Sequence, residues 1–253
     1  MKKTTNKPEI FEVGGCVRDE LLGIESNDID FTFVLPNLDK TVEEGFAIMT
    51  KHLEDNKFKI FLSTPDCFTI RAMFPEDHEH KGTVADFVMA RKESGHIKGT
   101  RVAKFKLGTL EDDLLRRDFT VNAMAKALDG TIIDPFDGAS DLSEMILDTP
   151  RNPMLTMIDD PLRMLRAIRF SITKDMMIHP RVEKAMAQPE LIDRLKETVS
   201  TERIREELSK AFKHDTLKTM RVLSEIDKEL PGFLDVCFPP EITLLPSMKK
   251  IKK

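Results

Sequence analysis

Short runs of alternating apolar and polar residues fill the first half of the chain and predict β-strands joined by helices. The clearest run, 28–35, places its apolar residues on one face of a strand and Asp28, Asp30 and Thr32 on the other. Further strands are expected over 10–13, 57–62, 67–74 and 83–89, helices over 17–22 and 39–56, and polar loops over 74–82 and 93–100.

The second half has apolar residues at helical spacing from about residue 138 onward. Ser200 precedes one of these segments as a plausible N-cap. The whole pattern predicts an α+β protein, with a mixed sheet and flanking helices in domain 1–140 and an all-helical domain over 141–253. Helices are expected over 161–172, 182–187, 191–199, 201–213 and 217–230.

Composition changes this picture in two ways. The 253 residues are 40% hydrophobic and 33% charged, with no apolar run long enough to span a bilayer, so a folded cytoplasmic protein without a membrane partner is expected. Residues 151–253 carry 20 basic and 16 acidic residues although the whole chain has a net charge of −5, so a polyanion would meet the second half more easily. Helical surfaces rich in lysine and arginine explain the same excess.

The three scattered cysteines form neither a disulfide framework nor a zinc spacing.

The strongest local motif is Gly14-Gly15 before a predicted helix, followed by Asp28-Ile29-Asp30. Glycines let the backbone approach a phosphate, and the N–H groups at a helix start favour an anion. Two carboxylates on one strand face suit Mg²⁺, which prefers oxygen ligands and phosphates. Either piece alone is usually a plain turn or a surface pair, whereas the order of both is much more specific.

Four later segments strengthen this motif: RRDFTVNAMA at 116–125, DPFDGASDL at 134–142, DDPLRMLRAIRF at 159–170 and STERIREEL at 200–208. Together the five segments resemble the motifs of the class II CCA-adding enzymes and bacterial poly(A) polymerases of the polymerase-beta-like nucleotidyltransferase superfamily. The resemblance implies a nucleotidyltransferase head domain and addition of CMP and AMP, from CTP and ATP, to the 3′ end of tRNA by two-metal chemistry that releases pyrophosphate.

The resemblance also implies residue roles. Asp28 and Asp30 would hold the catalytic Mg²⁺ ions, and Asp86 matches a third acidic position, although a strand-end carboxylate explains it equally well. Asp118 has a second interpretation as the cap of a helix starting near Thr120. The residues expected to handle the triphosphate and ribose are Gly14, Gly15, Arg18, Arg116, Arg117, Asp118 and Asn122.

Base recognition is expected in the second domain. Asp160 and Arg163 are three apart, which predicts neighbours on one helix face, and the matching residues of the family read the edges of CTP or ATP. An intrahelical salt bridge explains the pair as well. Arg166 and Arg169 continue this face and are included as nucleotide-binding. Asp159 stands where the family usually has glutamate.

Two features leave the exact activity open. A basic loop over 93–104 matches an element that helps the family switch between nucleotides, and only about 40 residues follow the last motif, where family members continue into regions that grip tRNA. A compact enzyme, a homodimer or a loss of tRNA selectivity are all compatible with this. The alternatives in function are a poly(A) polymerase, a partial CC- or A-adding enzyme, and a catalytically silent RNA-binding protein.

The metal assignment predicts that Asp28→Ala or Asp30→Ala abolishes nucleotide addition and leaves the fold intact, because each change removes one hard oxygen ligand. Primer extension with circular dichroism on the same samples measures both. Substantial turnover by either folded variant would refute the assignment.

Overall fold

A computed structural model describes residues 7–26, 29–78, 80–96 and 103–239, and the side chains of 93–104 are not described. The chain divides into two compact units, Met1–Arg151 and Asn152–Lys253. The boundary between the units lies later in the chain than the expected one at 140/141, because the end of helix α4 and the strand β10 belong to the first unit. The functional roles expected for the two domains remain predictions.

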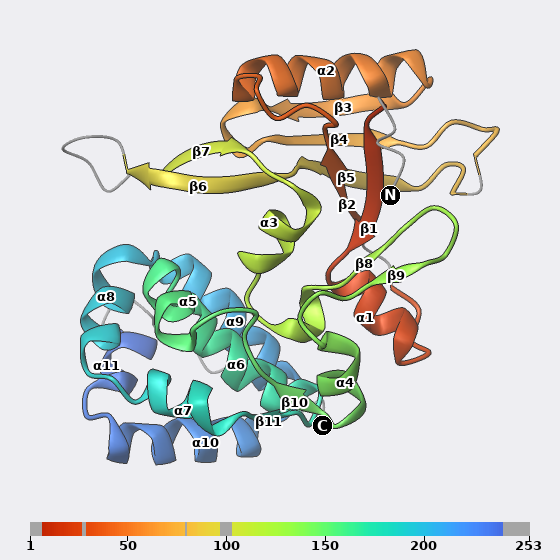
Figure 1. Cartoon of the computed structure of the whole chain (residues 1–253). Coiled ribbons are helices and arrows are strands. Elements are labelled where there is room, and N and C mark those ends of the chain that lie inside the picture. Colours follow the sequence, from red (N-terminus) through yellow and green to blue (C-terminus); the bar gives the residue numbers. More distant parts are fainter. Residues whose placement is uncertain (1–6, 27–28, 79, 97–102, 240–253) are drawn as a thin grey trace, which may run out of the picture. The chain divides into compact units, whose positions relative to one another are not determined.

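The first unit is built on a mixed sheet flanked by helices (Figure 1). Its strands are β1 (Glu9–Val13), β2 (Asp30–Val34), β3 (Lys59–Thr64), β4 (Thr69–Met73), β5 (Val84–Met89), β6 (Arg91–His96), β7 (Ala103–Leu107), β8 (Ala125–Lys126), β9 (Ile132–Ile133) and β10 (Ile146–Leu147). Its helices are α1 (Gly15–Leu21), α2 (Val42–Asp55), α3 (Leu110–Leu115) and α4 (Gly138–Ser143), with short 3₁₀ turns η1 (Pro65–Cys67) and η2 (Thr120–Asn122).

Seven strands form one sheet in the order β3-β4-β5-β2-β1-β8-β9. β2 and β5 are parallel, while β1 is antiparallel to both β2 and β8. The predicted class, a mixed sheet with flanking helices followed by a helical region, is confirmed.

The alternation along β2 separates two layers. Phe31 and Phe33 lie in a core with Phe87 of β5 and Met49 of α2, which lies along one face of the sheet (Figure 1). The opposite face packs against α3, whose Leu114 joins a second core with residues of β1 and β8. Asp30 and Thr32 alternate with the aromatic residues and therefore belong to the α3 face, as the pattern predicted.

The prediction of a polar loop over 93–100 is wrong in part, because residues up to His96 belong to a strand. β6 and β7 pair in antiparallel register, with Arg91 opposite Leu107 and Glu93 opposite Phe105. Polar and charged residues fill most of this hairpin, so the apolar alternation that marks a strand is missing, and backbone pairing alone reveals it.

The second unit is helical except for the two-residue strand β11 (Met177–Ile178). The expected N-cap is confirmed, since the Ser200 hydroxyl accepts from the Arg203 amide at 3.4 Å. Leu162, Leu165 and Ile168 are buried along one helix, as its spacing predicted. The helices are α5 (Pro153–Asp159), α6 (Leu162–Thr173), α7 (Pro180–Met186), α8 (Glu190–Thr198), α9 (Thr201–His214), α10 (Thr216–Glu229) and α11 (Phe233–Cys237). Across the described part of both units, no helix has the length and hydropathy needed to cross a bilayer.

α4 fixes the position of η2 by very close packing. The Asp134 carboxylate accepts from the Gly138 and Ala139 amides, both at 2.8 Å, and the Thr120 hydroxyl donates to Asp141 at 2.5 Å. A Cβ at Gly138 would lie 2.2 Å from the Thr120 carbonyl oxygen. Only glycine therefore allows this contact, which determines where the polar residues beside η2 lie.

We expect Gly138→Ala to lower the free energy of unfolding by about 3 kcal/mol, because a backbone carbonyl must move to admit the methyl group. Gly23→Ala is the control: its φ of +69° is strained, but nothing lies within 4 Å of the added methyl, so a loss of about 1 kcal/mol is expected. Urea unfolding followed by circular dichroism measures both, since the chain has no Trp or Tyr. Equal losses would contradict the packing argument.

Candidate nucleotide-binding site

Sheet register brings the glycine turn and the carboxylate strand together. Asp30 is opposite Val13 of β1 on one side and opposite Asp86 of β5 on the other. Val13 leads directly into Gly14, so the turn lies beside Asp30, and the two aspartates are neighbours on adjacent parallel strands about 4.8 Å apart in the backbone. The third predicted carboxylate, Asp28, lies outside the described residues.

Asp86 has a partner that the sequence did not predict. Arg71 of β4 is opposite it in the register and donates from Nε and from a terminal nitrogen to its two oxygens, at 2.8 and 2.9 Å. This bidentate contact orients the carboxylate and offsets its charge. An arginine opposite an acidic residue on a neighbouring strand indicates such a pair, but this signal can be used only when the order of the strands in the sheet is known.

The donor set fits a hard divalent cation. Within the described residues no three His, Cys, Asp or Glu groups converge, and Asp30 with Asp86 forms the carboxylate pair. Mg²⁺ in nucleotide sites usually takes one or two carboxylates and completes its shell with water and substrate phosphates. Asp30 and Asp86, with Asp28 two residues before Asp30, therefore match the oxygen chemistry of a magnesium-nucleotide site.

The backbone at Gly14 favours glycine, and the space beside it is occupied by an arginine side chain. Its φ is +82°, in the left-handed region, and a Cβ there would lie 2.6 Å from a terminal nitrogen of Arg117. The guanidinium of Arg117 therefore lies against the backbone of the turn. Two of the residues expected to contact phosphate, far apart in sequence, are brought together here.

A buried carboxylate that the sequence analysis missed holds both arginines of the RRD motif. Asp113, on α3, lies 3.5 Å from Arg116 and 3.3 Å from Arg117, and it accepts from the Thr32 hydroxyl at 3.0 Å. It is 3% exposed. Asp113 is three and four residues before the two arginines, a spacing that could have predicted these ion pairs on a helix. Its contact with Thr32 of β2 could not be predicted from the sequence.

A second network joins α1 to η2. A terminal nitrogen of Arg18 donates to the Asn122 side-chain oxygen at 2.5 Å, and the Asn122 amide donates to Asp118 at 3.0 Å. Arg18 also donates three hydrogen bonds to the Asp19 carboxylate, at 2.8, 2.9 and 3.0 Å. These expected site residues are thus adjacent. The interpretation of Asp118 as a helix cap is wrong, because η2 has Phe119 at its N-cap and no side-chain cap bond.

Cys16, inside the glycine-turn motif, is excluded as a nucleophile by its surroundings. Burial raises the pKa of its thiol, and the thiol donates to the Val13 carbonyl at 3.3 Å. It therefore stays protonated at neutral pH. The chemistry of this site rests on the carboxylates and guanidinium groups.

In the second unit, Asp160 lies in the extended junction between α5 and α6, with φ −144°. The prediction that it shares a helix face with Arg163 is wrong, since Pro161 follows it and disfavours helical backbone at the preceding residue. One Asp160 oxygen accepts from the Leu162 amide at 3.2 Å and the other from Arg203 of α9 at 2.8 Å. Arg163 donates to the Thr156 carbonyl at 3.0 Å.

Arg166 and Arg169 of α6 contact a buried acid, Glu207 of α9. Arg166 lies 3.4 Å from it, and Arg169 donates to its second oxygen. Arg169 also stacks on Phe170, with 4.2 Å from its guanidinium carbon to the ring centre. These contacts fasten α6 to α9, and the nucleotide-binding role expected for the two arginines stays a prediction.

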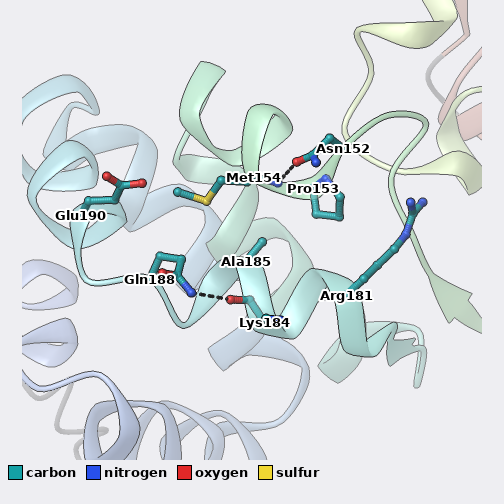
Figure 2. Close-up of a pocket in the computed structure, with 8 residues that line it drawn as sticks. All are labelled: Asn152, Pro153, Met154, Arg181, Lys184, Ala185, Gln188 and Glu190. Carbon is teal, nitrogen blue, oxygen red and sulfur yellow. Dashed lines mark hydrogen bonds between the residues drawn. The ribbon is translucent and has the colours of Figure 1, made fainter.

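A separate hollow of about 760 Å³ lies in the second unit beside the starts of α5 and α8 and along α7 (Figure 2). Figure 2 shows the Asn152 side chain bonded to the Met154 amide, at 2.9 Å, and Gln188 bonded to the Lys184 carbonyl, at 3.0 Å. None of the residues expected to bind nucleotide lines it. Its charged residues, Arg181, Lys184 and Glu190, are of both signs.

Comparisons with known proteins agree on one family. A model of the poly(A) polymerase head domain matches residues 10–148. The tRNA nucleotidyltransferase cca2 of Schizosaccharomyces pombe is 33% identical over 216 residues, which cover 81% of this chain and 43% of that protein. The multifunctional CCA protein of Chromobacterium violaceum is 31% identical over 233 residues, covering 87% and 51%. The chain thus spans about half the length of the curated relatives it matches.

Solved structures give the same result. The CCA-adding enzyme of Thermotoga maritima complexed with tRNA has a TM-score of 0.67 at 26% identity, covering 95% of this chain and 50% of that one. The Bacillus stearothermophilus CCA-adding enzyme in complex with CTP has a TM-score of 0.67 at 28% identity, covering 90% and 51%.

We expect Asp113→Asn to lower the free energy of unfolding by about 2 kcal/mol, because two arginines lose the charge that offsets theirs and a buried acceptor is weakened. The partial exposure of both arginines keeps the loss below that of a fully buried pair. The control Glu111→Gln makes the same charge change at an exposed position of α3, and we expect it to change stability by less than about 0.5 kcal/mol. Urea unfolding compares the two, and losses of equal size would refute the anchoring role.

Proposed function

The chain belongs to the poly(A) polymerase head-domain family, and on that premise we propose that it is a template-independent nucleotidyltransferase adding CMP and AMP to the 3′ end of tRNA. Relatives named tRNA nucleotidyltransferase and CCA-adding enzyme support the RNA end as acceptor. The structures of relatives complexed with tRNA and with CTP support the two substrates.

The observation that carries the proposal is the register across the sheet. Val13, Asp30 and Asp86 are opposite one another on the adjacent strands β1, β2 and β5, and Gly14 follows Val13 directly, with the Arg117 guanidinium against this turn. A triphosphate needs backbone and guanidinium donors beside oxygen ligands for its cation, and this arrangement supplies both.

The cation belongs to the proposal as well. Mg²⁺ held by Asp28, Asp30 and Asp86 would neutralise phosphate charge and lower the pKa of the attacking hydroxyl. The protein's own contribution is to keep Asp30 and Asp86 side by side on adjacent strands, with Asp86 oriented by Arg71.

The proposed reaction is in-line attack of the RNA 3′ oxygen on the α-phosphorus of CTP or ATP. The 3′ oxygen loses its proton to solvent and forms a bond to the α-phosphorus. The bond from the α-phosphorus to the oxygen that bridges it to the β-phosphorus breaks, and pyrophosphate leaves with the bridging oxygen. Arg116 and Arg117 would bind the leaving phosphates, since guanidinium groups pair with phosphate oxygens in two places at once. Rate acceleration would come from positioning and charge stabilisation rather than from a covalent intermediate.

Ribose and base would be read by other polar groups. Asp118 and Asn122 are buried beside Arg18, and carboxylate and amide groups bond sugar hydroxyls. We assign base recognition to Asp160 and Arg163 in the second unit. Arg203 would restrain the Asp160 carboxylate, while Glu207 would restrain Arg166 and Arg169 on the same helix.

Primer extension on tRNA transcripts ending before CCA, after C and after CC tests the proposal, with CTP, ATP or both and Mg²⁺. We expect three, two and one added nucleotides, because base recognition by protein side chains stops the reaction once CCA is complete. Asp30→Ala, shown to be folded by circular dichroism, is the control without a catalytic carboxylate.

The other outcomes identify the alternatives. A long adenosine ladder would assign poly(A) synthesis, and addition of only C or only A would assign a partial enzyme. Failure of the folded wild-type chain to extend any transcript, together with RNA binding, would replace the proposal with a silent RNA-binding protein.

A further inference from the structure

Three side chains form a cluster where the β6–β7 hairpin leaves the sheet. The guanidinium carbon of Arg91 lies 4.7 Å from the ring centre of Phe68 and 4.7 Å from that of Phe105. The two rings meet edge to face at 5.7 Å, and Arg91 donates to the Cys67 carbonyl at 3.2 Å. Both distances from the guanidinium are within the range of a cation–π contact.

Phe105 also lies beside a second guanidinium. The guanidinium carbon of Arg116 is 5.8 Å from the Phe105 ring centre, and Arg116 lies 3.5 Å from the buried Asp113. Arg116 is therefore held on one side by a carboxylate and on another by an aromatic ring. The ring comes from β7, whereas Asp113 comes from α3, so two elements determine where this guanidinium lies.

The two contacts restrain Arg116 in different ways. A carboxylate accepts N–H bonds, so it competes with a phosphate for the same donors. The negative face of an aromatic ring attracts the cation through its quadrupole and uses none of the five N–H donors. A ring is thus a suitable partner for a guanidinium that must hold its position and still bind a triphosphate.

The hairpin base is itself tightly fixed. The Gly108 amide donates to the Ala90 carbonyl at 3.0 Å, and a Cβ at Gly108 would lie 2.7 Å from the carbonyl carbon of Arg91. Arg91 and Phe105 are diagonal neighbours across the hairpin, because Arg91 is opposite Leu107. The ring beside Arg116 is therefore set by backbone packing rather than by an independent loop.

We propose that Phe105 is a positioning residue for Arg116, holding that guanidinium ready for the nucleotide phosphates through its ring face. This inference rests on the proposed function, since it assigns Phe105 to the nucleotide site through Arg116. Arg91 and Phe68 fix the ring in turn. Residues of the β6–β7 hairpin base thereby contribute to nucleotide binding without touching the nucleotide.

The test replaces Phe105 in the full chain with mono-, di- and trifluorinated phenylalanine, which weaken the ring quadrupole stepwise with little change in ring size. We expect the KM for CTP and ATP and their Kd in the presence of Mg²⁺ to rise together along the series, reaching about two- to tenfold. The kcat should change by less than about twofold, because the ring acts on phosphate binding before and during reaction alike.

Matched variants separate the ring face from simple packing. Phe105→Trp should retain wild-type KM, whereas Phe105→Leu should resemble the trifluorinated protein; thermal melts establish that each is folded. The same fluorinated series at Phe61, an exposed ring on β3 near Lys59, serves as control and should leave KM unchanged.

Two negative results have different meanings. Wild-type chain that neither binds nor transfers CTP or ATP would overturn the proposed function, and this inference with it. Active wild-type protein whose KM and Kd stay constant across the fluorinated series at position 105 would overturn the role of Phe105 alone.

Discussion

The buried carboxylate of Asp113 is the interaction on which the first unit's candidate site depends. Arg116 and Arg117 would repel each other if they were left alone on neighbouring positions, and Asp113 offsets both while accepting a bond from Thr32 of β2. A carboxylate this deeply buried is stable only when it is paired and hydrogen-bonded. The same contacts therefore tie α3 to the strand that carries Asp30 and set both arginines beside it.

Close backbone approach is the second constraint, and glycine makes it possible in two places. Gly14 lets the Arg117 guanidinium lie against the turn, and Gly138 lets α4 pack on the Thr120 carbonyl. The contact at Gly14 places Arg117 beside the glycine turn of the candidate site. The contact at Gly138 positions η2, and with it the hydrogen-bonded pair Asp118 and Asn122. A methyl group at Gly138 would meet backbone, whereas one at Gly14 would displace the end of the Arg117 side chain, so backbone packing limits the position of η2 and the turn controls where Arg117 lies.

In the second unit, as in the first, a buried carboxylate pairs with two arginines. Glu207 is buried against Arg166 and Arg169 in the way that Asp113 is buried against Arg116 and Arg117. In each unit an acid on one helix restrains two cations, which lowers the entropy that those long side chains would lose on binding a ligand. Asp160, in the junction between α5 and α6, is also restrained by a residue of another element, Arg203 of α9.

Local patterns in the sequence predicted the secondary structure and the buried face of several elements. The period-two alternation of β2 determined that Asp30 and Thr32 share a face opposite Phe31 and Phe33, and the order of motifs indicated the family. A strand or helix period depends only on neighbours in the chain, so it is visible without a fold. The β6–β7 hairpin was missed because its mostly polar residues lack that period, and its identity depends on pairing between its strands.

Partners of the charged groups were decided by the tertiary structure. Thr32 and Asp113 are 81 positions apart, and Asp160 and Arg203 are 43 apart. Asp86 meets Arg71 only because β4 and β5 are adjacent in register. The sequence by itself determined which residue types are present and, where an element has a regular apolar period as in β2 and α6, which face of that element each residue occupies. For pairs that join distant elements, packing decided which opposite charge each residue meets, because electrostatic pairing depends on distance in space, and the number of residues between two groups does not determine that distance once elements fold against one another.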